Sequence, residues 1–164
     1  MKYSRFEELP VWQAAVELAK QIYAFTAKPV WKSHYSLRDQ IERAVISISN
    51  NIAEGFERGT TQELINFLYI ARGSAAEVRS MLCVLDHLPP FRECSAEIAG
   101  LKPQAEGISR QLRAWADSLQ NTDIKGPRYL TDKVRRTTKA TQDREEFLKQ
   151  LRQTTRSPAG ESEG

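Results

Sequence analysis

Apolar residues recur at steps of three and four over residues 98–119, and this rhythm constrains the fold more than any other feature of the sequence. The steps are 3, 4, 3, 4, 3 and 4. They connect Ile98, Leu101, Ala105, Ile108, Leu112, Trp115 and Leu119. Such spacing places these side chains on one stripe of a helix, as in the seams of helix bundles. We therefore predict a helix from about residue 92 to 120, with a kink or an interruption at Pro103.

Three further segments show helical spacing of their apolar residues. They cover about residues 9–27, residues 36–59 and residues 60–88. Ser36 is the expected N-cap of the second segment, and Thr60 with Glu63 forms a capping-box pattern at the start of the third. The predicted core stripes are Trp12, Ala15, Val16, Ala19, Ile22 and Tyr23; Leu37, Ile41, Ala44, Val45, Ile48, Ile52 and Phe56; and Leu64, Phe67, Leu68, Ala71, Ala75, Val78, Leu82 and Leu85.

Short connections between successive long helices make neighbouring helices antiparallel. The region up to about Asn121 shows almost no alternating pattern of the kind typical of a strand. We therefore predict an all-α fold, an antiparallel up-down-up-down four-helix bundle.

The chain changes character after residue 124. Residues 1–124 hold 14 basic and 15 acidic residues, a net charge of −1, whereas residues 125–164 hold 10 and 6, a net charge of +4. Gly126–Pro127 separates the two parts. We interpret residues 1–124 as the bundle and 125–164 as a basic, largely flexible tail. Phe147, Leu148 and Leu151 favour a short amphipathic helix at 142–153.

The composition is that of a soluble globular protein, with 40% hydrophobic and 27% charged residues. The apolar stretches are far shorter than the roughly 20 residues that cross a bilayer, and the N-terminal residues lack a signal-peptide pattern. We expect a cytoplasmic protein without a membrane partner. Cys83 and Cys94 are too few for a disulfide framework.

The residues for common catalytic chemistry are missing. A di-iron bundle needs Glu-x-x-His pairs, but Trp31 precedes His34 by three residues and Val84 precedes His87. There is no Gly-rich phosphate loop, G-x-S-x-G or H-E-x-x-H motif. We expect no enzymatic activity, no catalytic residues, no metal and no cofactor.

The second helical segment carries a polar stripe as well as an apolar one. It consists of Gln40, Arg43, Ser47, Asn51, Glu54 and Arg58. Serine and asparagine are weaker helix formers than the Glu, Lys and Ala typical of a solvated face, so a specific contact is indicated. Gly55 and Gly73 favour close approach of helices or subunits. Two interpretations stay open: a contact with a ligand or nucleic acid, or a structural network at a subunit contact formed by Arg43, Asn51, Glu54, Arg72 and Glu77.

Four blocks of sequence resemble a known family. They are Phe6-Glu7-Glu8-Leu9-Pro10-Val11-Trp12-Gln13, Leu37-Arg38-Asp39-Gln40-Ile41, Ser47-Ile48-Ser49-Asn50-Asn51-Ile52-Ala53-Glu54-Gly55, and Phe67-Leu68-Tyr69-Ile70-Ala71-Arg72-Gly73-Ser74 with Glu77. Over about residues 5–120 the chain resembles the four-helix-bundle proteins encoded by intervening sequences of large-subunit ribosomal RNA genes. The resemblance implies a ring-shaped homopentamer. It extends to Avd, the accessory variability determinant of diversity-generating retroelements, which binds nucleic acid and partners a reverse transcriptase.

The leading hypothesis is a non-enzymatic accessory protein that scaffolds RNA or an RNA–DNA complex, with a reverse transcriptase as partner. Lys and Arg neutralise phosphates whatever the base sequence. The expected nucleic-acid contacts are Arg38, Arg58, Lys133, Arg135, Arg136 and Lys139. Five tails of +4 would bring about +20 to one pentamer.

Two alternatives belong to other classes. The first is an interaction ring without direct nucleic-acid binding, in which Trp31, Tyr35 and Phe91 near the helix ends contact a partner protein. The second is an enzyme with a site built from Arg43, Glu54 and Glu77 at the subunit boundary.

Overall fold

The computed structural model describes residues 3–121, which form helices and turns without a β-strand. The four long helices are α1 (Pro10–Thr26), α2 (Tyr35–Glu57), α3 (Thr61–His87) and α4 (Ser95–Gln120). Three 3-10 helices precede α1, α2 and α4: η1 (Phe6–Glu8), η2 (Pro29–Ser33) and η3 (Pro89–Cys94). None of the described helices is long and apolar enough to cross a membrane. The predictions for residues 125–164, including the helix at 142–153, lie outside the described residues.

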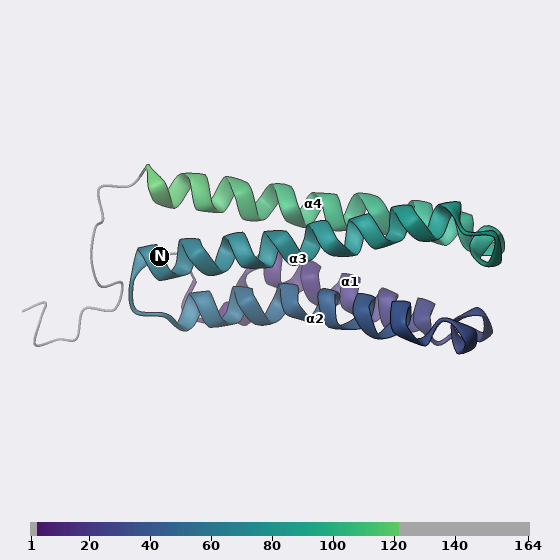
Figure 1. The fold of residues 1–164 in the computed structure, drawn as a ribbon. Coiled ribbons are helices and arrows are strands. Elements are labelled where there is room, and N and C mark those ends of the chain that lie inside the picture. Colours follow the sequence, from purple (N-terminus) through teal and green to yellow (C-terminus); the bar gives the residue numbers. More distant parts are fainter. Residues whose placement is uncertain (1–2, 122–164) are drawn as a thin grey trace, which may run out of the picture. The chain divides into compact units, whose positions relative to one another are not determined.

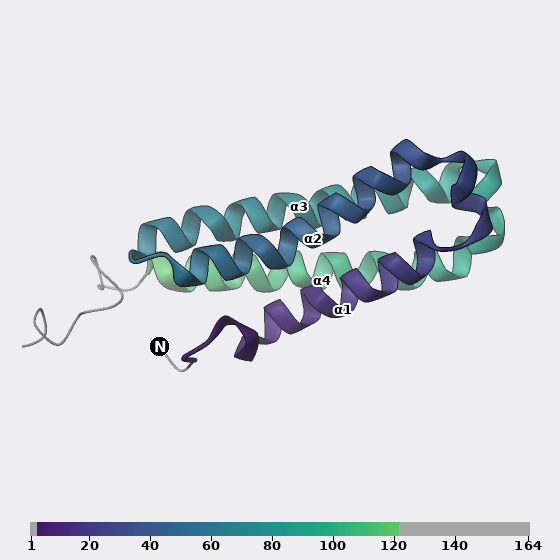
Figure 2. The same cartoon turned by 90° about the horizontal axis from the view of Figure 1, so that it is seen from below.

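The four long helices form the predicted up-down-up-down bundle. Each helix contacts the next one in the chain, and α1 also contacts α4. The α1–α2 and α3–α4 connections lie at one end of the bundle (Figure 1). The α2–α3 connection and the last turn of α4 lie at the other end, as the view from below also shows (Figure 2). The short connections therefore alternate the helix directions.

The predicted apolar stripes of α2 and α3 are confirmed. Of their fifteen predicted side chains, Leu37 and Phe67 are half-buried and the other thirteen are buried. Thr60 also caps α3 as predicted: its hydroxyl accepts the Glu63 N–H at 3.2 Å and donates to the Glu63 carboxylate at 2.8 Å. These two helices supply the centre of the core.

The prediction for α1 is partly wrong, because the core face is rotated. Ala15, Ala19 and Ile22 are buried as expected, but Tyr23 is 45% exposed. The buried side chains that the prediction missed are Val11, Leu18, Phe25 and Thr26. Two apolar stripes overlap on this helix, and packing against α2 and α4 selects the one that contains Leu18 and Phe25.

One predicted helix start and one predicted N-cap are also wrong. The last helix begins at Ser95 rather than near residue 92, because residues 89–94 form the 3-10 helix η3. The expected interruption at Pro103 is absent, since α4 continues through it. Pro103 and Ala99, whose carbonyl loses its intrahelical donor, are both exposed, so water can satisfy that carbonyl. Helix α2 begins at Tyr35, with His34 instead of Ser36 at the N-cap.

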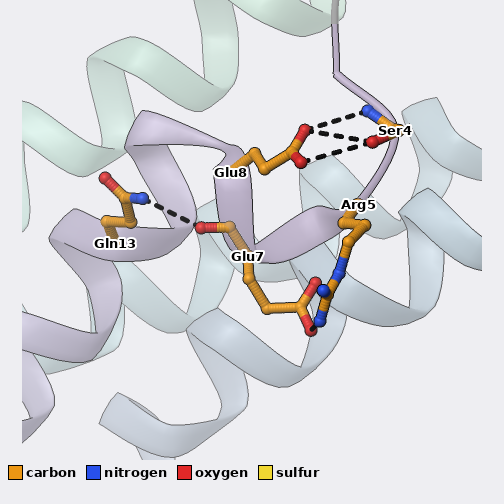
Figure 3. Close-up of polar contacts among 5 residues, drawn as sticks. All are labelled: Ser4, Arg5, Glu7, Glu8 and Gln13. Atoms are coloured by element: carbon orange, nitrogen blue, oxygen red, sulfur yellow. Dashed lines mark hydrogen bonds and ion pairs between the residues drawn. The ribbon is translucent and has the colours of Figure 1, made fainter.

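Polar contacts hold the N-terminal segment against α1 (Figure 3). The backbone N–H of Ser4 donates to the Glu8 carboxylate at 3.0 Å. Arg5 pairs with Glu7 at 2.8 Å, and the Gln13 amide donates to the Glu7 carbonyl at 2.9 Å. These contacts fix η1 against the first turn of α1.

Aromatic side chains close the opposite end of the bundle. Trp31 of η2 packs edge-on against Phe25 and Phe91, with ring centroids 5.2 and 4.9 Å apart. His34 packs against Phe91 at 5.1 Å. Trp31 and Phe91 are each 1% exposed. These contacts hold η2 and η3 together.

Candidate functional site

The polar stripe of α2 borders an open cleft of about 450 Å³. Its lining comes almost entirely from α2, with Tyr23 of α1 at one side. The lining residues are Tyr23, Asp39, Glu42, Arg43, Ile46, Ser47, Asn50, Asn51 and Glu54. Three carboxylates and one guanidinium therefore face the same depression. We call this surface the α2 cleft.

Hydrogen bonds to α3 and within α2 account for part of the unusual composition of this helix. The hydroxyls of Ser47 and Ser74 lie 2.9 Å apart. The Asn51 amide donates to the Ser47 carbonyl at 2.7 Å, and the Ser49 hydroxyl donates to the Ile46 carbonyl at 3.1 Å. Asn50 is exposed in the cleft. Contacts within the bundle therefore account for Asn51 but not for the choice of asparagine at position 50.

The five residues of the predicted network do not join one another within the described part of the chain. Arg43 pairs with Asp39 at 3.3 Å, and Glu54 with Arg58 at 2.6 Å. Glu77 accepts from the Gln40 amide at 3.1 Å. Arg72 is half-buried and has no ion-pair partner among residues 3–121. Their pairing between subunits stays a prediction.

The two predicted close approaches differ. A Cβ added to Gly55 would lie 2.7 Å from Cβ of Phe67, so α2 and α3 meet there as predicted. A Cβ added to Gly73 would meet nothing within 4 Å. Of these two glycines, only Gly55 marks a close contact between helices within the described chain.

The two bundle arginines expected to contact nucleic acid are both ion-paired. Arg38 binds Glu42 at 2.8 Å, and Glu42 also accepts from the buried hydroxyl of Thr26 at 2.5 Å. Arg58 binds Glu54, and this hydrogen bond raises the pKa of the guanidinium above its ordinary value. A phosphate would have to compete with a carboxylate for either side chain. Lys133, Arg135, Arg136 and Lys139 lie outside the described residues.

Ion pairs engage most of the lysines and arginines that the structure describes. Ten of the thirteen lysines and arginines within residues 3–121 lie within 4.0 Å of a carboxylate oxygen. The three others are Lys32, Arg72 and Arg92. The bundle therefore neutralises most of its own cations.

One comparison with known proteins decides the family. A sequence profile described as 23S rRNA-intervening sequence protein matches residues 7–114, which is well over half of the chain. The chain belongs to this family. No curated protein matches the chain by sequence. In this 23S rRNA-intervening sequence protein, the matched residues contain α1 to α3, the α2 cleft and most of α4, but not residues 125–164.

The aromatic residues of the interaction hypothesis divide into two kinds. Trp31 and Phe91 are buried in the bundle, where a partner cannot reach them. Tyr35 is 75% exposed at the start of α2. Of the three, only Tyr35 is placed for contact with another protein.

An apolar groove that the sequence did not reveal lies between the start of α1 and the last turns of α4. Its volume is about 450 Å³. The lining residues are Tyr3, Leu9, Pro10, Val11, Gln111, Ala114 and Trp115. Trp115 was expected in the core stripe of α4 but is only half-buried. Its side chain lines this groove.

The histidines and carboxylates of residues 3–121 do not form a metal site. No group of three or more His, Cys, Asp or Glu among these residues is arranged to hold a metal ion. Nδ1 of His34 contacts the Val30 carbonyl at 2.9 Å, and Nδ1 of His87 contacts the Cys83 carbonyl at 2.8 Å. Each histidine therefore binds the preceding helical turn.

Proposed function

We propose that this 23S rRNA-intervening sequence protein is a non-enzymatic accessory protein that binds nucleic acid and scaffolds RNA or an RNA–DNA complex in the cytoplasm. Its proposed partner is a reverse transcriptase, as in the diversity-generating retroelements that contain Avd. The family description names an intervening sequence of 23S rRNA, which supports a connection with RNA. The observation that carries the proposal is the distribution of charge.

The bundle and the tail differ in the net positive charge that they offer to a phosphate. Ten of the thirteen described cations are engaged by carboxylates, and residues 1–124 carry a net charge of −1. The excess of +4 belongs to residues 125–164. Affinity for nucleic acid rises with the number of phosphates that Lys and Arg neutralise. We therefore assign the main phosphate contacts to the tail.

Assembly into a homopentameric ring is part of the proposal, because it would bring five tails to one RNA. Gly73, Ala76 and Ser80 are exposed along α3, and small residues allow a helix of another subunit to approach closely. Native mass spectrometry of the full chain tests the ring. We expect five copies for the wild type and smaller species for Gly73→Leu. A monomeric wild type would contradict the ring.

Replacement of the tail cations tests nucleic-acid binding. We expect a variant with Lys133, Arg135, Arg136 and Lys139 changed to Gln to lose most of its affinity for RNA at low salt. The control is Arg38→Gln with Arg58→Gln, which removes two cations that are already paired, so its loss should be smaller. Equal RNA binding by the wild type and the tail variant would contradict the assignment to the tail.

The apolar groove and the exposed Tyr35 favour a second candidate, an interaction ring without direct nucleic-acid binding. Apolar contacts with a partner protein depend little on salt, unlike phosphate contacts. A wild-type protein that fails to bind RNA at low salt would replace the first proposal with this one.

A further inference from the structure

The three described cations without a carboxylate partner are not evenly placed. Arg72 is half-buried in α3, whereas Lys32 in η2 and Arg92 in η3 are exposed. Lys32 follows Trp31 in the chain, and Arg92 follows Phe91. The Trp31 and Phe91 rings pack 4.9 Å apart and so hold the two 3-10 helices side by side. Both free, exposed cations of residues 3–121 therefore lie at one end of the bundle.

Two long helices also begin at this end (Figures 1 and 2). Neither α2 nor α4 has a side-chain cap at its N-terminus. The first turn of α2 contains no acidic residue, and Glu97 in the first turn of α4 is engaged by Lys28. The N–H groups and the dipole at a helix N-terminus favour an anion. Their field therefore adds to the charges of Lys32 and Arg92.

The carboxylates at this end are largely occupied. Asp86 accepts from Lys102 at 2.6 Å and from the Ser95 hydroxyl at 3.1 Å, and Glu97 binds Lys28. Glu93 is exposed without an ion-pair partner among residues 3–121. The balance of unpaired charge is thus two cations against one carboxylate.

We propose that the η2–η3 end of the bundle binds the phosphate backbone of RNA through Lys32 and Arg92, with the first-turn amides of α2 as additional donors. This inference rests on the proposed RNA binding and adds a contact on the bundle itself. In a ring, rotational symmetry would repeat the same end on every subunit, so each weak contact would be multiplied along one RNA.

The test compares RNA binding by full-length variants over a salt series, with a 20-nucleotide single-stranded RNA as the probe. Lys32→Gln with Arg92→Gln removes the two free cations. Lys20→Gln with Arg110→Gln is the matched control: it removes the same charge, but Lys20 and Arg110 are paired with Glu17 and Glu106. We expect the first variant to bind more weakly, with a slope of log K against log salt smaller by about 1.4, for two phosphate contacts. Glu93→Gln should bind more tightly than the wild type.

Amide hydrogen exchange locates the contact independently. RNA should slow exchange in residues 28–38 and 88–98 more than in residues 54–64 at the opposite end. Equal affinities and slopes for the two double variants would overturn the inference, as would protection confined to other segments. If RNA binding depends on the tail but not on Lys32 and Arg92, the inference fails while the proposed function stands. A wild type that binds no RNA at low salt overturns both.

Discussion

Three of the four glycines within the long helices, Gly55, Gly73 and Gly100, meet different surroundings. A Cβ at Gly55 would lie 2.7 Å from Cβ of Phe67 and 3.2 Å from a methyl group of Leu64, whereas Gly73 and Gly100 have nothing within 4 Å. Cβ of Phe67 is bonded to its backbone, so it yields only if α2 and α3 move apart. Packing between α2 and α3 therefore requires glycine at position 55. At positions 73 and 100, packing within one chain does not require glycine, which there only lowers helix stability through its backbone entropy.

We expect Gly55→Ala to lower the free energy of unfolding by about 1–3 kcal/mol, because it overpacks the contact between α2 and α3. Gly100→Ala is the control and should raise it by roughly 0.5–1 kcal/mol, since alanine is the better helix former. Urea denaturation followed by circular dichroism measures both. A neutral Gly55→Ala would contradict the close approach.

Asp86 makes stability depend on pH. Hydrogen bonds from Lys102 and then from Ser95 lower the pKa of its carboxyl. A carboxyl with a lowered pKa in the folded state stabilises the protein above the pKa of the unfolded state, about 3.9, and this contribution is lost as the pH falls through the folded value. Asp86→Asn should therefore lower the melting temperature at pH 7, and the difference from the wild type should shrink below about pH 4. A difference that is constant with pH would contradict the role of the charge.

The N-cap at Thr60 is a local contact that sets where α3 begins. The Thr60 hydroxyl accepts the Glu63 N–H and so satisfies one of the free donors of the first turn. We expect Thr60→Ala to cost about 0.5–2 kcal/mol of stability. Thr61→Ala replaces the next threonine, which is inside the helix, and should have a smaller effect. Thermal unfolding of the two variants checks this, and equal losses would contradict the cap.

The helices differ in how far the local spacing of apolar residues determines which side chains are buried. The stripes of α2 and α3 each offer one main apolar face, so most of their buried side chains follow from spacing, although Ile65 and Met81 of α3 were missed. Helix α1 has two overlapping apolar faces, and only contact with α2 and α4 decides that Leu18 and Phe25 are inside while Tyr23 is exposed. The start of α4 depends on the 3-10 turn after Pro89–Pro90, which helical periodicity does not detect.

The candidate site was predicted less completely than the core. Spacing identified the polar stripe of α2 because serine and asparagine are unusual on a solvated helix face. Spacing does not identify partners on other helices, so the contacts of Ser47 with Ser74 and of Gln40 with Glu77 became visible only in the fold. The unpaired state of Lys32 and Arg92 likewise depends on which carboxylates the turns bring near them.

At the scale of the whole molecule, the distribution of charge separates two roles. The bundle pairs most of its cations internally. We propose that its polar and small-residue surfaces on α2 and α3 contact other subunits. The tail carries the excess positive charge. We therefore interpret the bundle as the scaffold and the tail as the main contact with nucleic acid, with the η2–η3 end as a second contact.

The salt dependence of RNA binding tests this account most directly. The measurement compares the full chain with a chain that ends at Gly126, which keeps α4 whole because that helix ends at Gln120. We expect steep salt dependence for the full chain and a slope smaller by about 3 after truncation, for four phosphate contacts to a single strand. Identical slopes for the two chains, or no binding of RNA by the full chain at low salt, would contradict the account.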